Sequence, residues 1–166
     1  GGQAVSYFAP GGAGNAALLA DIDTAIADAG VPLRIDGGIF INGEKEVSPY
    51  TSNAWANAMT SLVSDLQTRY CGGRAFRSVV RMLPYYTYEH LAGVDTVRAE
   101  ISAWVATDAS NRVTFSMDDD YTGPPGGGAI LTNAEWWEFW PSVHGGTPQR
   151  WAEGIRASAA ISALGL

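Results

Sequence analysis

The chain has 166 residues, of which 46% are hydrophobic and 16% are charged. This length fits one domain or at most two small ones, and the apolar content is too high for an intrinsically disordered chain. The sequence contains no apolar run near the roughly 20 residues of a membrane-spanning helix, and its single cysteine, Cys71, excludes a disulfide scaffold.

Ten basic residues against seventeen acidic ones give a net charge of -7. An acidic chain gains nothing from the counterion release that drives nucleic-acid binding, so neither nucleic acid nor an anionic membrane is an expected partner. Four arginines within thirteen residues are a local exception: Arg69, Arg74, Arg77 and Arg81. They fit a solvated or ion-paired helix face, and alternatively a contact with a small anion, RNA or an acidic neighbouring subunit.

The first part of the chain combines short strand patterns with one helix pattern. Residues 4–9 predict a strand, and residues 15–29 predict a helix with Asn15 as its N-cap. Gly30 stands where a left-handed residue ends a helix. Residues 31–35 predict a strand at a sheet edge, because proline lacks the N–H that a central strand needs.

A hairpin and the clearest helix of the sequence follow. The pair Asn42-Gly43 suits a type I′ turn, so residues 39–47 predict a β-hairpin. Residues 52–70 carry large apolar side chains at helical spacing, and they predict a helix that Gly72 ends.

The next segment, residues 74–83, fits two structures. A helix with apolar residues on one face and arginines opposite is the favoured interpretation, but the pair Val79-Val80 leaves a strand open. Residues 96–107 predict a further helix, and the alternation over residues 112–117 predicts a half-buried strand.

The last quarter combines a Gly/Pro-rich loop with two helix patterns. Residues 118–128 predict the loop, a capping box opens a short helix over residues 132–140, and residues 147–164 predict the final helix. The sequence therefore predicts a single α+β domain over residues 1–166. We expect it to be mixed and helix-rich, with the β-hairpin (39–47), a small sheet and long Gly/Pro loops.

One segment resembles a known ligand-binding motif. Residues 12–17 have the sequence Gly-Ala-Gly-Asn-Ala-Ala, which resembles the G-x-G-x-x-A form of the dinucleotide-binding fingerprint. The resemblance implies that Gly12, Gly14 and Asp36 bind a cofactor, because glycines let the backbone approach a pyrophosphate and a helix N-terminus offers free N–H groups. The other interpretation is a plain glycine turn before a helix.

Carboxylates supply a second candidate site. The run of aspartates at positions 118–120 is the only acidic cluster, and Asp118 and Asp120 together with more distant glutamates have the hard oxygens that Mg²⁺ or Ca²⁺ prefers. A solvated acidic loop is the alternative. Zinc is not expected, because His90 and His144 are the only histidines and Cys71 is an inert thiol by default.

Aromatic residues are the remaining signal. Trp136, Trp137, Phe139 and Trp140 crowd into five residues of the predicted short helix. Adjacent helical side chains point about 100° apart, so these four rings cannot all face one core. Some must meet a second surface, which is another part of this domain, a subunit interface or a ligand platform such as a sugar-stacking site.

These observations predict a structural or assembly subunit, such as a capsid, shell or decoration protein, that acts through protein–protein interfaces and needs no cofactor. Its expected partners are other protein subunits in a homo- or hetero-oligomer, in a virion or another large assembly. The start Gly1-Gly2 leads us to expect a processed piece of a longer chain. The alternative is a nucleotide-binding or metal-assisted enzyme domain that uses the unit from Gly12 to Asp36 or the loop from Asp118 to Asp120.

Overall fold

The computed structural model describes residues 3–47, 50–83, 93–116 and 147–165, with backbone only for residues 44 and 147–153. Its elements, in chain order, are α1 (Val5–Phe8), α2 (Asn15–Asp28), β1 (Gly37–Phe40), the 3-10 helix η1 (Glu44–Val47), α3 (Ala54–Tyr70), β2 (Arg77–Arg81), α5 (Val94–Ala106), β3 (Arg112–Phe115) and α7 (Thr147–Ala163). The prediction of a mixed, helix-rich fold with a small sheet is confirmed. None of the helices in these ranges combines the length and apolarity that crossing a bilayer requires.

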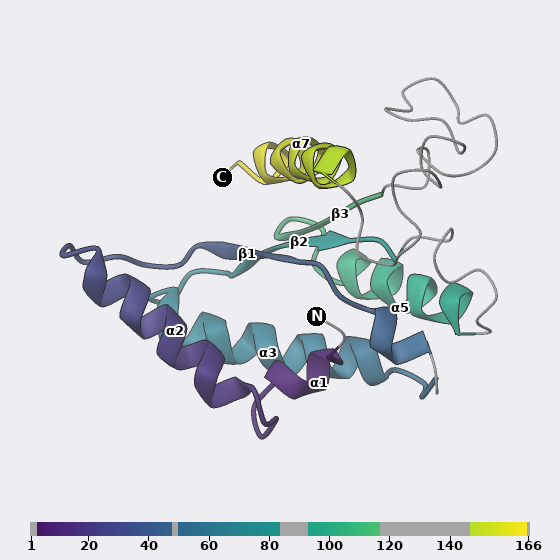
Figure 1. Ribbon diagram of the computed structural model, residues 1–166, viewed down its shortest axis with the longest axis horizontal. Helices are drawn as coiled ribbons and strands as arrows, with labels where there is room; N and C mark the ends of the chain where they lie inside the picture. Colours follow the sequence, from purple (N-terminus) through teal and green to yellow (C-terminus); the bar gives the residue numbers. More distant parts are fainter. Residues whose placement is uncertain (1–2, 48–49, 84–92, 117–146, 166) are drawn as a thin grey trace.

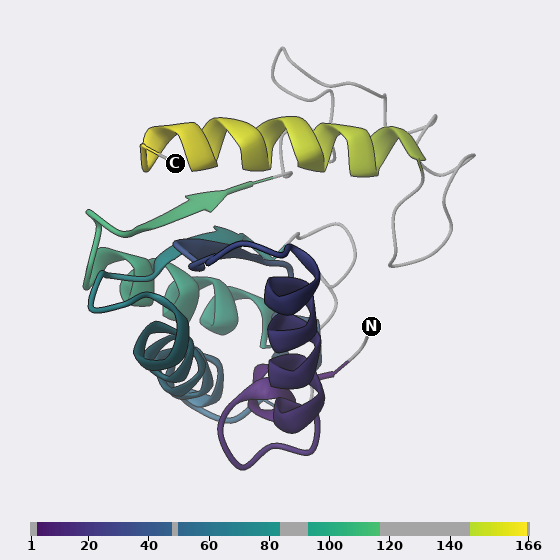
Figure 2. The ribbon, with the colours of Figure 1, turned by 90° about the vertical axis from the view of Figure 1, so that its left-hand side faces the viewer.

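The three strands form a parallel sheet in the order β1-β2-β3. The register places Ile39 beside Val79 and Val79 beside Val113. Along the chain, α3 lies between β1 and β2, and α5 lies between β2 and β3. Both helices pack on one face of the sheet, together with α1 and α2, while α7 lies across the opposite face (Figures 1 and 2).

The main core fills the space between the sheet and α3 and α5. The helical spacing of α3 turns its large apolar residues to one side, where they are buried: Trp55, Met59, Leu62, Val63 and Leu66. Across from them α5 buries Val97, Ile101 and Trp104. The rings of Trp55 and Trp104 meet edge to face, with centroids 5.7 Å apart and planes at 90°.

A second, smaller core lies on the other face of the sheet. Val79 and Phe115 pack there against Ala157 and Ala160 of α7. Because side chains alternate along a strand, Val79 faces α7 while its neighbour Val80 belongs to the main core. The central strand β2 is therefore buried on both faces, as a parallel sheet requires.

The predicted hairpin over residues 39–47 is wrong. β1 pairs with β2, and the chain after it turns into η1. Gly43 does take a positive φ of 111°, but Asn42 accepts a hydrogen bond from the indole N–H of Trp55 at 2.8 Å. Glu46 then accepts the N–H of Val5 at 2.6 Å. These contacts hold the segment against α1 and α3, so it does not fold back as a strand.

Two other local predictions are also wrong. Residues 4–9 contain the short helix α1 in place of a strand, and residues 31–35 contain no regular element. Residues 74–83 contain β2 and not the favoured helix, because both faces of the segment are covered. The helices predicted over residues 15–29, 52–70, 96–107 and 147–164 are confirmed in α2, α3, α5 and α7, and the strand predicted over residues 112–117 is confirmed in β3. The predicted loop over residues 118–128 and the predicted helix over residues 132–140 lie outside the described residues.

One buried carboxylate joins α5 to the start of α3. Glu100 is only 8% exposed, and its Oε1 accepts the Tyr50 hydroxyl at 2.7 Å and the Asn53 N–H at 2.5 Å. Its Oε2 accepts the N–H of Ala56 at 3.4 Å. Asn53 is the N-cap of α3 and has a left-handed φ of 58°, so the carboxylate from α5 supplies the acceptor that the cap side chain does not.

We expect Glu100→Ala to lower the free energy of unfolding by about 2–3 kcal/mol, because it leaves the donors of three part-buried hydrogen bonds without their acceptor. Urea denaturation measures this loss. Ser102→Ala, on the exposed side of the same helix, is the control and should change stability by less than about 0.5 kcal/mol. Equal effects of the two substitutions would show that the carboxylate does not anchor α3.

Candidate functional site

The glycines of the fingerprint-like segment serve packing in this structure. No strand precedes them, since α1 takes that place. A Cβ on Gly12 would lie 2.2 Å from the carbonyl oxygen of Ser6, and one on Gly14 would lie 2.0 Å from the ring of Tyr7. Both positions therefore need glycine so that α2 can begin close against α1.

Asp36 is not brought to these glycines. Gly12 and Gly14 lie at the beginning of α2, beside α1, whereas Asp36 comes directly before β1. Its carboxylate meets the guanidinium of Arg74 at 3.5 Å. The structure thus lacks the strand-turn-helix geometry that the dinucleotide resemblance implies for Gly12, Gly14 and Asp36.

A pair of glycine substitutions tests the packing role of Gly12. Gly12→Ala should destabilise the protein by about 1–3 kcal/mol, because its Cβ meets backbone atoms that cannot rotate away. Gly154→Ala is the matched change on α7, where a Cβ meets nothing within 4 Å. It should stabilise the protein by about 0.5–1 kcal/mol through helix propensity. Thermal or urea unfolding separates the two, and a neutral Gly12→Ala would refute the packing role.

Several predicted site residues lie outside the described residues. These are the metal candidates Asp118 and Asp120 and the aromatic cluster Trp136, Trp137, Phe139 and Trp140. The two histidines, which were not predicted as ligands, also lie outside the described residues. Within the described ranges, no group of three or more metal-ligating side chains comes together. The metal and aromatic sites stay predictions.

The exposed apolar side chains of the described residues concentrate in one stretch. Six large hydrophobic residues are exposed among the described residues, and four of them lie between residues 31 and 41: Val31, Leu33, Ile39 and Ile41. Their exposed fractions run from 48% to 57%. We call these four residues the arm–edge surface, because they follow α2 and continue along β1 at the edge of the sheet.

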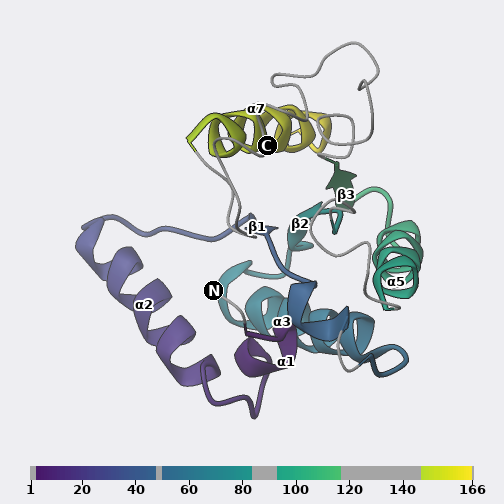
Figure 3. The same cartoon turned by 45° about the vertical axis from the view of Figure 1, so that its right-hand side comes forward.

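Ile39 of the arm–edge surface is exposed while the other strands are covered, because α7 packs mainly against β3 and β2. Phe40 packs into the main core, so by alternation Ile39 faces the side of the sheet on which α7 lies. That helix packs on β3 and β2. Figures 1 and 3 show α2 and the segment after it reaching outward beyond the sheet.

The outward-reaching α2 is held by a few contacts with α3. Half-buried Leu18, Leu19 and Ile22 pack against the main core, but no residue of α2 is buried. The hydroxyl of Tyr70 donates to the carboxylate of Asp23 at 2.9 Å. Burial, followed by this hydrogen bond, raises the pKa of Tyr70, so the phenol stays protonated as the donor at neutral pH.

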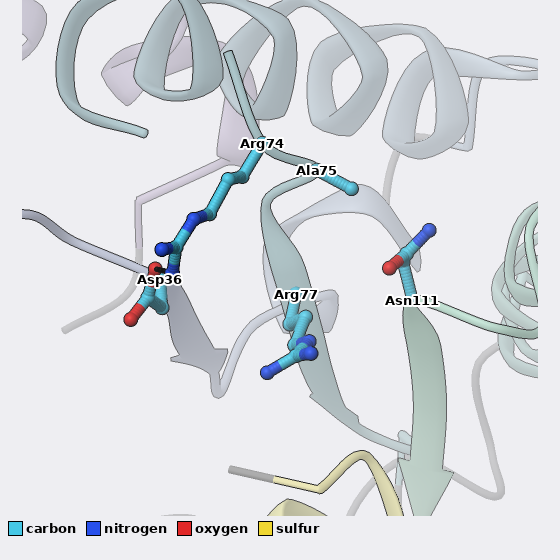
Figure 4. A pocket seen from close by; sticks show the side chains of 5 residues that line it. All are labelled: Asp36, Arg74, Ala75, Arg77 and Asn111. Atoms are coloured by element: carbon cyan, nitrogen blue, oxygen red, sulfur yellow. Dashed lines mark hydrogen bonds and ion pairs between the residues drawn. The ribbon is translucent and has the colours of Figure 1, made fainter. Parts of the chain in front are cut away.

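The four clustered arginines separate in the structure. Arg69 pairs with Asp65 one helical turn earlier, at 2.8 Å, and Arg81 is buried in β2. Arg74 and Arg77 lie at the amino end of the sheet, where they line an open hollow of about 360 Å³ with Asp36, Ala75 and Asn111 (Figure 4). The predicted common face therefore does not form, and two arginines remain together at one site.

The burial of Cys71 agrees with the expectation that it is an inert thiol. Its side chain is 0% exposed, and its Sγ lies 3.1 Å from the carbonyl oxygen of Ile35. Burial raises the pKa of the Cys71 thiol. A buried, protonated thiol is a poor nucleophile. The contact with Ile35 instead holds the end of α3 against the segment before β1.

No family model, curated protein or solved structure matches this chain.

Neither the arm–edge surface nor the hollow lined by Arg74 and Arg77 was predicted from the sequence. The apolar alternation at residues 31–41 is a strand signal in the sequence, and it does not show that the side facing α7 stays open. The arginine pair was visible, but the separation of Arg74 and Arg77 from the other two depends on residues 74–83 forming a strand.

Proposed function

We propose that this chain is a structural subunit that associates with a second copy of itself through the arm–edge surface. The observation that carries this proposal is the exposure of Val31, Leu33, Ile39 and Ile41 along a single stretch. A parallel sheet is normally covered on both faces, and the side of β1 that bears Ile39 has no covering helix among the described residues. A neighbouring copy supplies that cover.

The burial energy supports reversible association. Full burial of a large aliphatic side chain is worth about 1.5–3 kcal/mol, so these half-exposed residues contribute about half as much each. A two-fold interface buries the surface twice, which gives roughly 6–12 kcal/mol in total. Lost translation and rotation cost about 4–15 kcal/mol. We therefore expect a concentration-dependent equilibrium.

The edge of β1 supplies a self-complementary contact. In the parallel register the N–H of Arg77 binds the carbonyl oxygen of Asp36 at 2.9 Å, so the N–H and C=O groups of Gly37 and Ile39 point away from β2. A second copy of the same edge, related by a two-fold axis, presents matching donors and acceptors in antiparallel orientation. A continuous sheet across two copies satisfies them.

Charge also favours a copy of this chain as the partner. Arg34 lies within the apolar stretch, is exposed, and makes no ion pair with any described residue. The chain carries seven more acidic than basic residues, and Asp21 and Asp28 of α2 are exposed. An acidic copy therefore offers carboxylates to the free guanidinium at the edge of the interface.

Matched isoleucine substitutions test the proposal. Ile39→Glu should weaken self-association by at least about tenfold, which corresponds to ~1.4 kcal/mol, because it places a charge on both sides of the interface. Ile155→Glu is the control, since Ile155 is 55% exposed but lies on α7. Sedimentation velocity over a range of protein concentrations measures the association constant of each protein.

Two results would contradict the proposal. One is a wild-type protein that stays monomeric at every concentration. The other is an equal loss of association in Ile39→Glu and Ile155→Glu. If the protein is a monomer and Ile39→Glu changes its tryptophan emission, the chain's own cluster of Trp136, Trp137, Phe139 and Trp140 covers β1. That outcome also overturns the proposal.

The broader assignment to a capsid, shell or decoration protein stays a proposal, as does a role for Trp136, Trp137, Phe139 and Trp140 in the interface. Aromatic residues are enriched in the cores of such interfaces, which supports including this cluster in a contact between subunits.

A metal-assisted enzyme is the second candidate, and one observation favours it. Open parallel sheets bind ligands beyond the carboxyl ends of their strands, and Asp118 follows the last residue of β3 by three positions. If this edge binds a cation, millimolar Mg²⁺ should raise the melting temperature of the wild type and not that of Asp118→Asn. No shift in the wild type would exclude the candidate.

A further inference from the structure

The hollow at the amino end of the sheet is built on a rigid frame. The N–H of Arg77 donates to the carbonyl oxygen of Asp36 at 2.9 Å, and the N–H of Ser78 donates to that of Asn111 at 2.8 Å. These bonds fix Asp36, Arg77 and Asn111 side by side, each where its strand begins. Three of the residues that line the hollow thus lie where three neighbouring strands begin (Figure 4).

The chain delivers Arg74 to the same hollow through a tight turn. Gly72 and Gly73 have positive φ values of 58° and 86°, and the N–H of Arg74 donates to the carbonyl oxygen of Cys71 at 3.2 Å. Left-handed backbone of this kind favours glycine. The turn brings the chain out of α3 and places Arg74 above the start of β1, beside Asp36 (Figure 4).

The charged side chains give the hollow a positive balance in an acidic protein. Arg74 and Arg77 bring two positive charges and Asp36 brings one negative charge. Arg77 makes no hydrogen bond or ion pair through its guanidinium with the described residues. A guanidinium presents a planar fork of N–H donors that matches the oxygens of a carboxylate or a phosphate.

We infer that this hollow binds a small oxyanion, a phosphate or a carboxylate group, between Arg74 and Arg77. Its volume of about 360 Å³ lies at the small end of the range of ligand pockets. The site goes beyond the proposed assembly function, because it lies at the amino ends of the strands and shares no residue with the arm–edge surface.

Asp36 competes with the anion only weakly. Its contact with Arg74 is 3.5 Å long, and the two side chains are 45% and 58% exposed. Exposed ion pairs contribute about 0–1 kcal/mol, so an oxyanion with two or more oxygens can replace the carboxylate of Asp36 on Arg74 at little cost. Removing the charge of Asp36 should then strengthen binding, which a purely structural role of this residue does not predict.

The test measures binding of inorganic phosphate, and separately of citrate, by isothermal titration calorimetry in a Tris buffer of low ionic strength. The wild type should bind at least one of them. Arg77→Gln should weaken binding at least about tenfold through loss of charge-assisted hydrogen bonds, and Asp36→Asn should strengthen it by about threefold or more. Phosphate alone binding would indicate a phosphate group as the natural ligand, and citrate alone a carboxylate.

Lys45→Gln is the matched control, because it also removes one exposed positive charge that makes no ion pair with the described residues, and Lys45 lies on η1, past the carboxyl end of β1, outside the lining of the hollow. It should bind the anion as the wild type does. Equal weakening in Lys45→Gln and Arg77→Gln would show general charge screening and overturn the inference, as would the absence of heat from both anions in the wild type. Unchanged urea denaturation of Arg77→Gln confirms that a loss of binding is not a loss of folding.

Discussion

The parallel pairing of β2 with both neighbours is the constraint on which the rest of the structure depends. A strand inside a parallel sheet needs apolar cover on both faces, and β2 has it, with Val80 toward α3 and α5 and Val79 toward α7. Once this pairing forms, the positions of α3 and α5 follow. Among the described residues, β1 is then left at an edge of the sheet, with Phe40 packed against the main core and Ile39 exposed on the other face.

The open side of β1 connects the fold to the proposed assembly. Ile39 and Ile41 are exposed where a covering helix would lie in a complete three-layer arrangement, and Val31 and Leu33 extend the same apolar stretch toward α2. A second copy that completes the layer also pairs the free edge of β1. The proposed oxyanion site depends on the same sheet in a different way, because the sheet aligns Asp36, Arg77 and Asn111 at the amino ends of its strands.

The amphipathic helices were predictable from the sequence because their burial depends on a local 3.6-residue spacing, as in α3 and α5. The strand over residues 77–81 was not predictable, because the apolar spacing around Val79 fits a helix equally well. Only the packing of other elements on both of its faces makes this segment a strand. The Asn42-Gly43 pair predicted a hairpin, but Trp55 and Glu46 make tertiary contacts that a local turn signal cannot show. The arm–edge surface and the hollow at the amino end of the sheet were not predictable either, because each depends on which parts of the sheet remain uncovered after folding.

Amide hydrogen exchange at the edge of β1 tests the central claim most directly. The N–H groups of Gly37 and Ile39 point away from β2 and bond to none of the described residues, so pairing with a second copy would protect them from exchange. If a second copy pairs with β1, exchange at these two amides slows as the protein concentration rises, while the amides of exposed α2 residues keep their rates. Exchange at Gly37 and Ile39 that is the same at every concentration would contradict association through this edge.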